Sequence, residues 1–155
     1  MGDVVFELKV LDPRLHEWGL PDFHSAMAAG IDLRACIDGP IEIAPQAPAV
    51  MVPSGVAIHI SRSDVVAFVL PRSGLGARLG LVLGQSVGTI DPDYQGEWVI
   101  PLVNRSAAGS APVEINPGDR IAQAVFLPLV RPAFRVVAQF SVATGRGAGG
   151  FGSTG

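Results

Sequence analysis

Asp91 and Tyr94 share one short segment, GTIDPDYQGEW (88–98), in which a carboxylate and an aromatic ring could serve one ligand together. The turn residues of this segment predict a β-hairpin, with Gly96 permitting positive φ and with Asp91, Asp93 and Tyr94 at the tip. The two aspartates by themselves are typical of turn-capping carboxylates. Tyr94 is the only tyrosine of the chain, and its place at a tip favours stacking on an ionised, aromatic ligand.

Two glycine-rich segments suit the phosphates of such a ligand. PRSGLG (71–76) places Arg72 and Ser73 before two glycines, and the backbone amides of such loops form anion-binding nests. GRGAGGFGSTG (145–155) holds six glycines in eleven residues, together with an arginine, a phenylalanine and two hydroxyl groups. The composition is typical of a floppy chain end, but glycines also let a backbone approach a phosphate closely. We therefore expect a phosphate-wrapping segment that orders on binding.

Gln123 is a polar side chain inside the apolar strand pattern of GDRIAQAVF (118–126), so it needs a structural or ligand hydrogen-bond partner. We interpret the neighbouring Asp119 as a turn cap and Arg120 as a solvated side chain. Cys36 is the single cysteine, and we interpret it as a small core residue rather than a nucleophile. A lone cysteine fits a reducing compartment.

Short β-strands must position these groups, because period-2 alternation of apolar and polar residues recurs along the chain. Val4, Phe6, Leu8 and Val10 are expected to share one inward face. Pro101 places its strand at an edge or a bulge. Only 16–30 and 71–80 could hold helices. The expected strands are 4–10, 31–37, 41–43, 49–52, 55–60, 65–70, 80–84, 97–103, 112–115, 121–129 and 134–140.

The composition agrees with an all-β fold of one domain, either a sandwich, a barrel or a jelly roll. The chain has 155 residues, of which 19 are glycine and 13 proline, so turns are frequent. Charged residues make up only 16%, which favours a surface partly covered by other subunits. The net charge of -3 argues against binding to nucleic acid or to a membrane surface. No signal layout or membrane-length apolar run is present, which predicts a cytoplasmic protein.

The five segments AGIDLRA (29–35), PRSGLG (71–76), GTIDPDYQG (88–96), GDRIAQAVF (118–126) and RGAGGFGSTG (146–155) together resemble the five motifs of trimeric dUTPases of the bacterial type. The resemblance implies a distorted jelly-roll β-barrel, 1–144, with a flexible C-terminal lid, 145–155. It implies a homotrimer whose active sites draw motifs from all three subunits. The implied reaction is hydrolysis of dUTP to dUMP and pyrophosphate, which keeps uracil out of DNA and supplies dUMP for thymidylate synthesis.

The resemblance also implies roles for individual residues. Asp91 matches the catalytic aspartate that activates the attacking water, and Tyr94 matches the ring that excludes a 2′-hydroxyl group. Asp32 matches the aspartate that holds Mg²⁺ through its water ligands, and Gln85 stands where relatives often have a base-contacting asparagine. The positions that match substrate-binding residues are Arg72, Ser73, Gly74, Gln85, Thr89, Ile90, Asp91, Tyr94, Val99, Gln123, Arg146, Phe151, Gly152, Ser153 and Thr154.

Two alternatives stay open at the level of the sequence. A dCTP deaminase shares the fold implied by the resemblance, although the hairpin and the tail fit the hydrolase better. A non-catalytic jelly-roll trimer that binds a nucleotide or a partner is the other. Asp91 argues against the non-catalytic trimer, because a protein that only binds a nucleotide does not need a carboxylate beside the α-phosphate.

Overall fold

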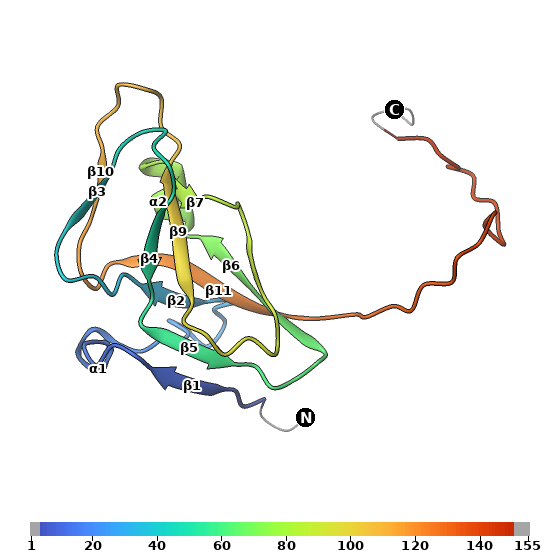
Figure 1. Ribbon diagram of the computed structural model, residues 1–155, viewed down its shortest axis with the longest axis horizontal. Helices are drawn as coiled ribbons and strands as arrows, with labels where there is room; N and C mark the ends of the chain where they lie inside the picture. Colours follow the sequence, from blue (N-terminus) through green and yellow to red (C-terminus); the bar gives the residue numbers. More distant parts are fainter. Residues whose placement is uncertain (1–3, 151–155) are drawn as a thin grey trace.

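The chain folds into antiparallel β-sheets with two short helices, as a computed structural model of residues 4–150 shows (Figure 1). The prediction of a mostly β protein is confirmed. Within the described residues, no helix is long and apolar enough to cross a membrane. The elements of this part of the chain follow in the order β1 (Glu7–Val10), α1 (Leu15–Trp18), β2 (Ile31–Arg34), β3 (Ile41–Ile43), β4 (Val50–Pro53), β5 (Val56–His59), β6 (Val65–Pro71), α2 (Ser73–Arg78), β7 (Leu81–Leu83), β8 (Gly88–Ile90), β9 (Val99–Asn104), β10 (Val113–Ile115) and β11 (Arg120–Pro128).

The largest sheet has the strand order β2-β11-β6-β8, and it joins segments that lie far apart in the sequence. A three-stranded sheet has the order β4-β9-β7, and two further pairs are β1-β5 and β10-β3. All of these ladders are antiparallel. The long pairing of β11 with β6 runs from Ala122 opposite Pro71 to Pro128 opposite Val65, so the C-terminal strand organises the sheet.

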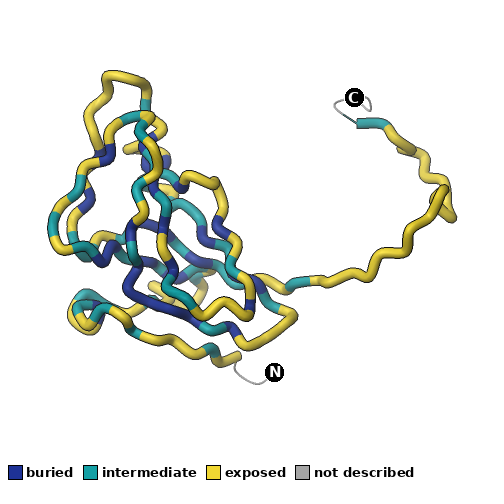
Figure 2. The backbone as a smooth tube through the Cα atoms, viewed as in Figure 1, coloured by how far each residue is buried: buried dark blue, intermediate teal, exposed yellow. Residues whose placement is uncertain are grey.

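The core lies between the sheets and follows the alternation expected from the sequence. Leu33 and Ala35 are fully buried, and Ile31 is nearly so. Figure 2 shows the buried residues along the central strands. Each large apolar side chain removed from water contributes about 1.5–3 kcal/mol. The burial pattern therefore explains why these short strands hold together without disulfides; the one cysteine, Cys36, is buried and free.

Three details of the strand prediction are wrong. Val4 and Leu8 are exposed, because β1 pairs only with β5 at the margin of the fold. Pro101 lies in β9, which is the central strand of its sheet rather than an edge. The carbonyl oxygen of Pro101 accepts a hydrogen bond from the amide of Gly84, one residue past the end of β7. The missing amide of Pro101 therefore falls where the ladder with β7 has already ended.

The third error concerns 134–140, which was expected to be a strand. The described chain from 129 to 150 contains no strand or helix and extends away from the sheets as an arm (Figures 1 and 2). Phe134, Val136 and Phe140 are each at least 90% exposed. The alternation in this segment is real, but no neighbouring strand of the same chain lies beside it to form a ladder.

Candidate active site

Most of the residues expected to bind phosphate line one pocket of about 530 Å³, here called the arginine pocket. Arg72, Ser73, Gly74 and Gln123 all line it, and so does Asp32, the expected metal residue. The structure thus brings together three segments that the sequence separates by up to about ninety residues. The residues that define the pocket chemically are Asp32, Arg72, Arg78, Arg120, Gln123 and His24.

The register of the large sheet builds this pocket. Gln123 of β11 lies opposite Asp32 of β2 on one side and opposite Leu70 of β6 on the other. Arg72 directly follows β6, and Ser73 begins α2. Gln123 Nε2 donates a hydrogen bond to the carbonyl oxygen of Pro71 at 3.1 Å. This structural partner answers the question of how a polar side chain is accommodated in β11, and it leaves the carbonyl oxygen of the Gln123 side chain free to accept another bond.

Asp32 is the centre of the polar cluster in the pocket, with its side chain only 13% exposed. Arg72 Nε donates to Asp32 Oδ1 at 2.9 Å. Arg120 Nη1 lies 3.3 Å from Asp32 Oδ2, and His24 Nε2 contacts the same oxygen. A buried carboxylate needs partners of this kind, because burial of an unpaired charge is costly.

Two of these contacts were missed from the sequence. Arg120, interpreted as solvated, has a side chain that is 39% exposed, but it also forms an ion pair with Asp32 across the sheet. Strand alternation gave no signal for this contact, because Arg120 and Gln123 are three residues apart and would face opposite sides of a regular strand, whereas the register of β11 shifts between Arg120 and Ala122. His24 lies in the loop between α1 and β2, and no spacing in the sequence connects it to the site. Asp119 does cap its turn, because its carboxylate accepts a hydrogen bond from the amide of Asn116.

The pocket has a strong positive bias, because the three arginines Arg72, Arg78 and Arg120 face the single carboxylate of Asp32. Arg78 Nε donates to the carbonyl oxygen of Gly74 at 3.2 Å, which holds its side chain over α2. Guanidinium groups bind phosphate oxygens in a fork geometry. The arrangement therefore suits a polyphosphate better than a neutral ligand.

A second pocket, of about 310 Å³ and here called the tyrosine pocket, contains the other group of expected site residues. Thr89, Ile90, Asp91, Tyr94 and Val99 all line it. Asp91 is exposed, so its carboxylate is accessible to water and to a ligand. Beneath these residues the indole of Trp98 is 1% exposed and packs against Phe126, with ring centroids 6.5 Å apart. The pocket thus presents a carboxylate and an aromatic ring above a rigid base.

The expected β-hairpin over 88–98 is wrong. β8 pairs with β6, whereas β9 pairs with β4 and β7, so the segment between them crosses from one sheet to another. A turn is nevertheless present, because the amide of Tyr94 donates to the carbonyl oxygen of Asp91 at 3.1 Å. β9 uses both of its edges in its own sheet and has none left for β8. Asp91 and Tyr94 therefore sit on a connection between sheets.

Gly96 does not adopt a positive φ. It is needed because the ring of Tyr94 lies too close to this position for a larger residue. A Cβ atom at this position would lie 2.4 Å from Tyr94 Oη and 2.6 Å from Tyr94 Cζ. The ring of Tyr94 lies over this glycine, and its hydroxyl group donates to the carbonyl oxygen of Glu97 at 3.1 Å. The tyrosine is 44% exposed. The loop thus fixes the ring while leaving one part of it open to a ligand.

The two pockets lie at opposite ends of β6. Ile90 pairs with Ala67, so Asp91 continues to the level of Val66, whereas Arg72 follows the other end of the strand. Six steps at a rise of about 3.3 Å per residue separate these levels by about 20 Å. The triphosphate of a single nucleotide is far shorter than this, so one chain cannot bring Asp91 and Arg72 to the same phosphate.

The remaining expected residues lie outside both pockets or outside the described chain. Gln85 is exposed in the loop between β7 and β8, where its amide nitrogen lies close to Gly88. Arg146 is exposed on the arm, and its Nε donates to the carbonyl oxygen of Gly149 at 2.8 Å. The expected residues Phe151, Gly152, Ser153 and Thr154 lie outside the described residues.

Cys36 is a core residue, as expected. Its side chain is 7% exposed, and burial is the main cause that raises the pKa of the thiol to about 12, with the carboxylate of Asp12 acting in the same direction. A thiol of this pKa carries almost no thiolate near neutral pH and is a poor nucleophile. Arg14 in turn holds the pKa of Asp12 below its usual value through side-chain hydrogen bonds.

The side chains of the arginine pocket fit a magnesium ion only if the phosphates of a bound ligand coordinate the ion as well. Within residues 4–150, no group of three or more acidic, histidine or cysteine side chains could hold a metal ion. Asp32 offers one carboxylate beside three arginines. The arginines can donate to a polyphosphate, and the carboxylate can accept from water. Mg²⁺ commonly keeps several waters and is bound through one or two carboxylates together with substrate phosphates.

Comparison with known proteins identifies the family. A dUTPase family model matches residues 16–155. The deoxyuridine 5′-triphosphate nucleotidohydrolase of Coxiella burnetii is 50% identical over 150 residues, which cover 96% of this chain and 95% of that protein. The enzyme of the same name from Salmonella arizonae is 49% identical over the same length, with the same coverage.

Solved structures show the same fold. A variant of the dUTPase of Staphylococcus bacteriophage 80alpha, with dUpNHpp, has a TM-score of 0.83 at 23% identity, covering 97% of this chain and 98% of that chain. A variant dUTPase from phage phi11 of S. aureus, whose structure reveals the coordination of a structural Mg(II) ion, has a TM-score of 0.74 at 22% identity and covers 89% and 99%. Because both the family model and relatives of about 50% identity span nearly the whole sequence, the chain belongs to the dUTPase family.

Proposed function

We propose that Asp91 is the general base in the hydrolysis of dUTP to dUMP and pyrophosphate, the reaction that this chain carries out as a member of the dUTPase family. Membership of the dUTPase family supports the reaction, and the geometry of the two pockets supports the assignment of residues. The observation that carries the proposal is that the two pockets present different chemical groups. One pocket presents an accessible carboxylate beside an aromatic ring, and the other presents three arginines.

Asp91 takes the proton of the water that attacks the α-phosphorus. An ionised carboxylate must lie within hydrogen-bond reach of that water, and the exposed position of Asp91 allows it. Tyr94 packs against the deoxyribose and leaves no room for a 2′-hydroxyl group. The backbone from Thr89 to Val99 binds the edge of the uracil, and close contact there excludes a 5-methyl group. Gln85 contributes to base binding from the neighbouring loop.

The arginine pocket holds the phosphates. Arg72, Ser73 and Gly74 bind phosphate oxygens, and Gln123 contributes its side-chain amide group. Asp32 holds water ligands of a magnesium ion that enters with the triphosphate. When bound, this ion neutralises the charge that develops as pyrophosphate leaves.

The active enzyme is a homotrimer of distorted jelly-roll barrels with shared active sites. The separation of about 20 Å between Asp91 and Arg72 along β6 supports this, since a second subunit must supply one of them. The arm supports it as well, because Phe134, Val136 and Phe140 are apolar and find no cover within the described chain. The segment 145–155 acts as a lid: Arg146, Ser153 and Thr154 contact the phosphates, Phe151 stacks on the uracil, and Gly152 lets the backbone approach.

A substrate panel tests the reaction. Incubation with dUTP, dCTP, dTTP and UTP, with and without Mg²⁺, should give pyrophosphate from dUTP alone, fastest with Mg²⁺. Asp91→Asn should bind a non-hydrolysable dUTP analogue like the wild type but turn over about 10²–10⁴-fold more slowly, because the amide cannot take the proton. Ammonia released from dCTP would instead show a deaminase, and wild-type turnover by Asp91→Asn would remove this residue from the base role.

A further inference from the structure

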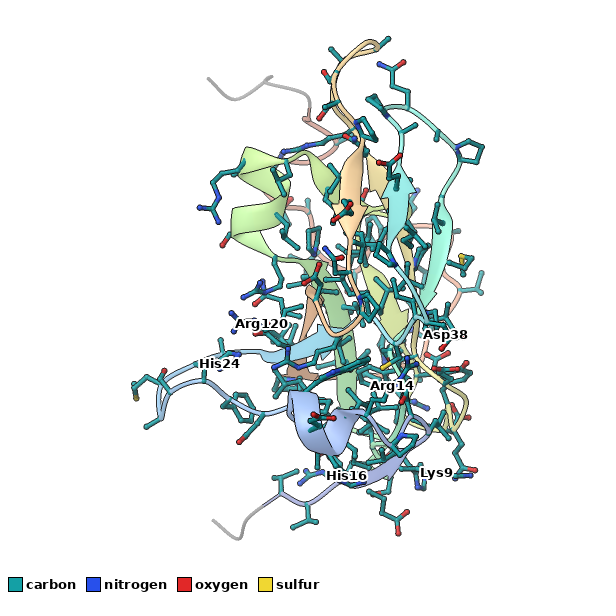
Figure 3. The ribbon with its side chains drawn as sticks, turned by 90° about the vertical axis from the view of Figure 1, so that its left-hand side faces the viewer. Lys9, Arg14, His16, His24, Asp38 and Arg120 are labelled. Atoms are coloured by element: carbon teal, nitrogen blue, oxygen red, sulfur yellow. The ribbon has the colours of Figure 1, made fainter. Side chains whose placement is uncertain are left out.

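His24 is a polar residue of the arginine pocket to which the proposed reaction gives no role. It lies in the loop between α1 and β2, and Figure 3 shows it on the same side of the molecule as Arg120, whereas His16 lies apart. Its Nε2 atom is 2.5 Å from Asp32 Oδ2 and 2.9 Å from Arg120 Nη1. Its side chain is 57% exposed, against 13% for Asp32, so it covers the carboxylate from the solvent side.

One nitrogen atom cannot satisfy both neighbours in the same way. Arg120 can only donate, so a bond to it would require a lone pair on Nε2. Asp32, as a carboxylate, can only accept, so the much shorter contact to it requires a proton on Nε2. A lone pair held this close to a carboxylate oxygen would be repelled. We therefore place the proton on Nε2, where it is donated to Asp32, and Arg120 then donates to Asp32 Oδ2 instead of to the ring.

This assignment nearly fills the acceptor capacity of Asp32. A carboxylate has about four lone-pair sites, two on each oxygen. His24 and Arg120 occupy both sites on Oδ2, and Arg72 Nε occupies one site on Oδ1. One acceptor site on Oδ1 remains.

We propose that His24 is a positioning residue: it fixes the Asp32 carboxylate so that its remaining acceptor site on Oδ1 is reserved for a water ligand of Mg²⁺. The inference rests on the proposed function, in which the nucleotide brings the metal. Without His24, Arg72 and Arg120 leave one lone-pair site on Oδ2 of Asp32 free. The carboxylate can then accept a hydrogen bond from bulk water at that site. Partners of this kind contribute about 10–100-fold to metal affinity when they orient a direct ligand.

Calorimetric binding of an α,β-imido analogue of dUTP tests the role without any turnover. The measured quantity is the ratio of the dissociation constant in EDTA to that in excess Mg²⁺. We expect His24→Ala to reduce this ratio about 3–10-fold, below the range for direct ligands because water intervenes. The dissociation constant in EDTA should not change. His24→Gln, whose amide can donate in place of Nε2, should restore most of the ratio.

His16→Ala is the matched control, since His16 is an exposed histidine on α1 outside the pocket. A thermal unfolding curve for each variant checks folding, and no shift is expected because His24 is largely exposed. Equal weakening in EDTA and in Mg²⁺ would make His24 a direct phosphate ligand and overturn the proposal. An unchanged ratio in His24→Ala, or a wild-type ratio near one, would overturn it as well.

A second readout separates this inference from the proposed function. Long-range proton–nitrogen NMR of the free protein reports which ring nitrogen of His24 carries the proton. Nε2–H is expected in the wild type, with loss of this preference in Asp32→Asn. A ring with a proton on Nδ1 and none on Nε2 would overturn the positioning role. Failure of the wild type to bind the dUTP analogue at all would instead refute the proposed function, and the NMR result would still decide the contact between His24 and Asp32.

Discussion

Co-refolding of two impaired variants, Asp91→Asn and Arg72→Ala, should recover activity well above that of either variant alone. Asp91 and Arg72 lie at opposite ends of β6, separated by about 20 Å at a rise of about 3.3 Å per residue. If both serve one phosphate chain, they must come from different subunits. Arg72→Ala alone should lose about 10–100-fold of its turnover, since a hydrogen bond to a charged group contributes about 1.5–3 kcal/mol.

The size of the recovery follows from the symmetry of the proposed homotrimer. In a random 1:1 mixture, a site is intact when the subunit that provides Asp91 carries Arg72→Ala and the neighbour that provides Arg72 carries Asp91→Asn. Each condition holds with a chance of about one half, so about one quarter of the sites should be intact. If one subunit provided both residues, no site would be intact.

The assay is steady-state pyrophosphate release from dUTP after denaturation and refolding of the mixture. Each variant refolded alone gives the baseline, and native mass spectrometry establishes that mixed trimers have formed. Recovery near one quarter of the wild-type rate supports the shared site. A mixed trimer that stays at the baseline would show that the separation along β6 has been misinterpreted.

Three further results are expected. Gly96→Ala should reduce the preference for dUTP over UTP in kcat/KM about ten-fold, because its Cβ would lie 2.6 Å from Tyr94 Cζ and must displace the ring; an unchanged preference would argue against Tyr94 as the sugar contact. In urea unfolding, the free energy of unfolding should fall as the pH rises from about 9 towards 12. Burial raises the pKa of the Cys36 thiol from 9.0 to about 12, so the unfolded chain ionises first and is favoured over this range. Cys36→Ala should lack this component of the pH dependence. Removal of residues 145–155 should leave the melting temperature nearly unchanged, because its described residues belong to no strand, but abolish most turnover; full turnover by the truncated chain would exclude a lid.

Several elements of the fold follow from local patterns in the sequence. The alternation around Leu33 predicts the buried face of β2, and the apolar run 65–70 predicts β6. The short helix in 71–80 is likewise confirmed as α2. These predictions succeed because side chains alternate across a strand whatever its partner is, so the residue order alone determines which face is apolar.

The same local reasoning fails where a partner decides the outcome. The segment 134–140 alternates like a strand but forms none, since no strand of the same chain lies beside it. The segment 88–98 has the turn residues of a hairpin, yet β8 and β9 pair in different sheets. Gly96 was expected to permit positive φ, but it makes room for the ring of Tyr94. Each of these outcomes depends on a neighbour that the local sequence does not specify.

The sequence by itself predicted which residues are candidates for chemistry, because residue type and motif spacing are local properties. Asp32, Arg72 and Gln123 were all predicted before the fold was considered, Asp32 only through the resemblance to dUTPases, and so was Asp91. Only the tertiary structure decided how they are grouped: strand pairing joins the first three in one pocket and places Asp91 at the far end of β6. It alone brought His24 against Asp32. Hydrogen bonds between strands act across long stretches of chain, and a register of this kind leaves no trace in the spacing of the residues that it unites.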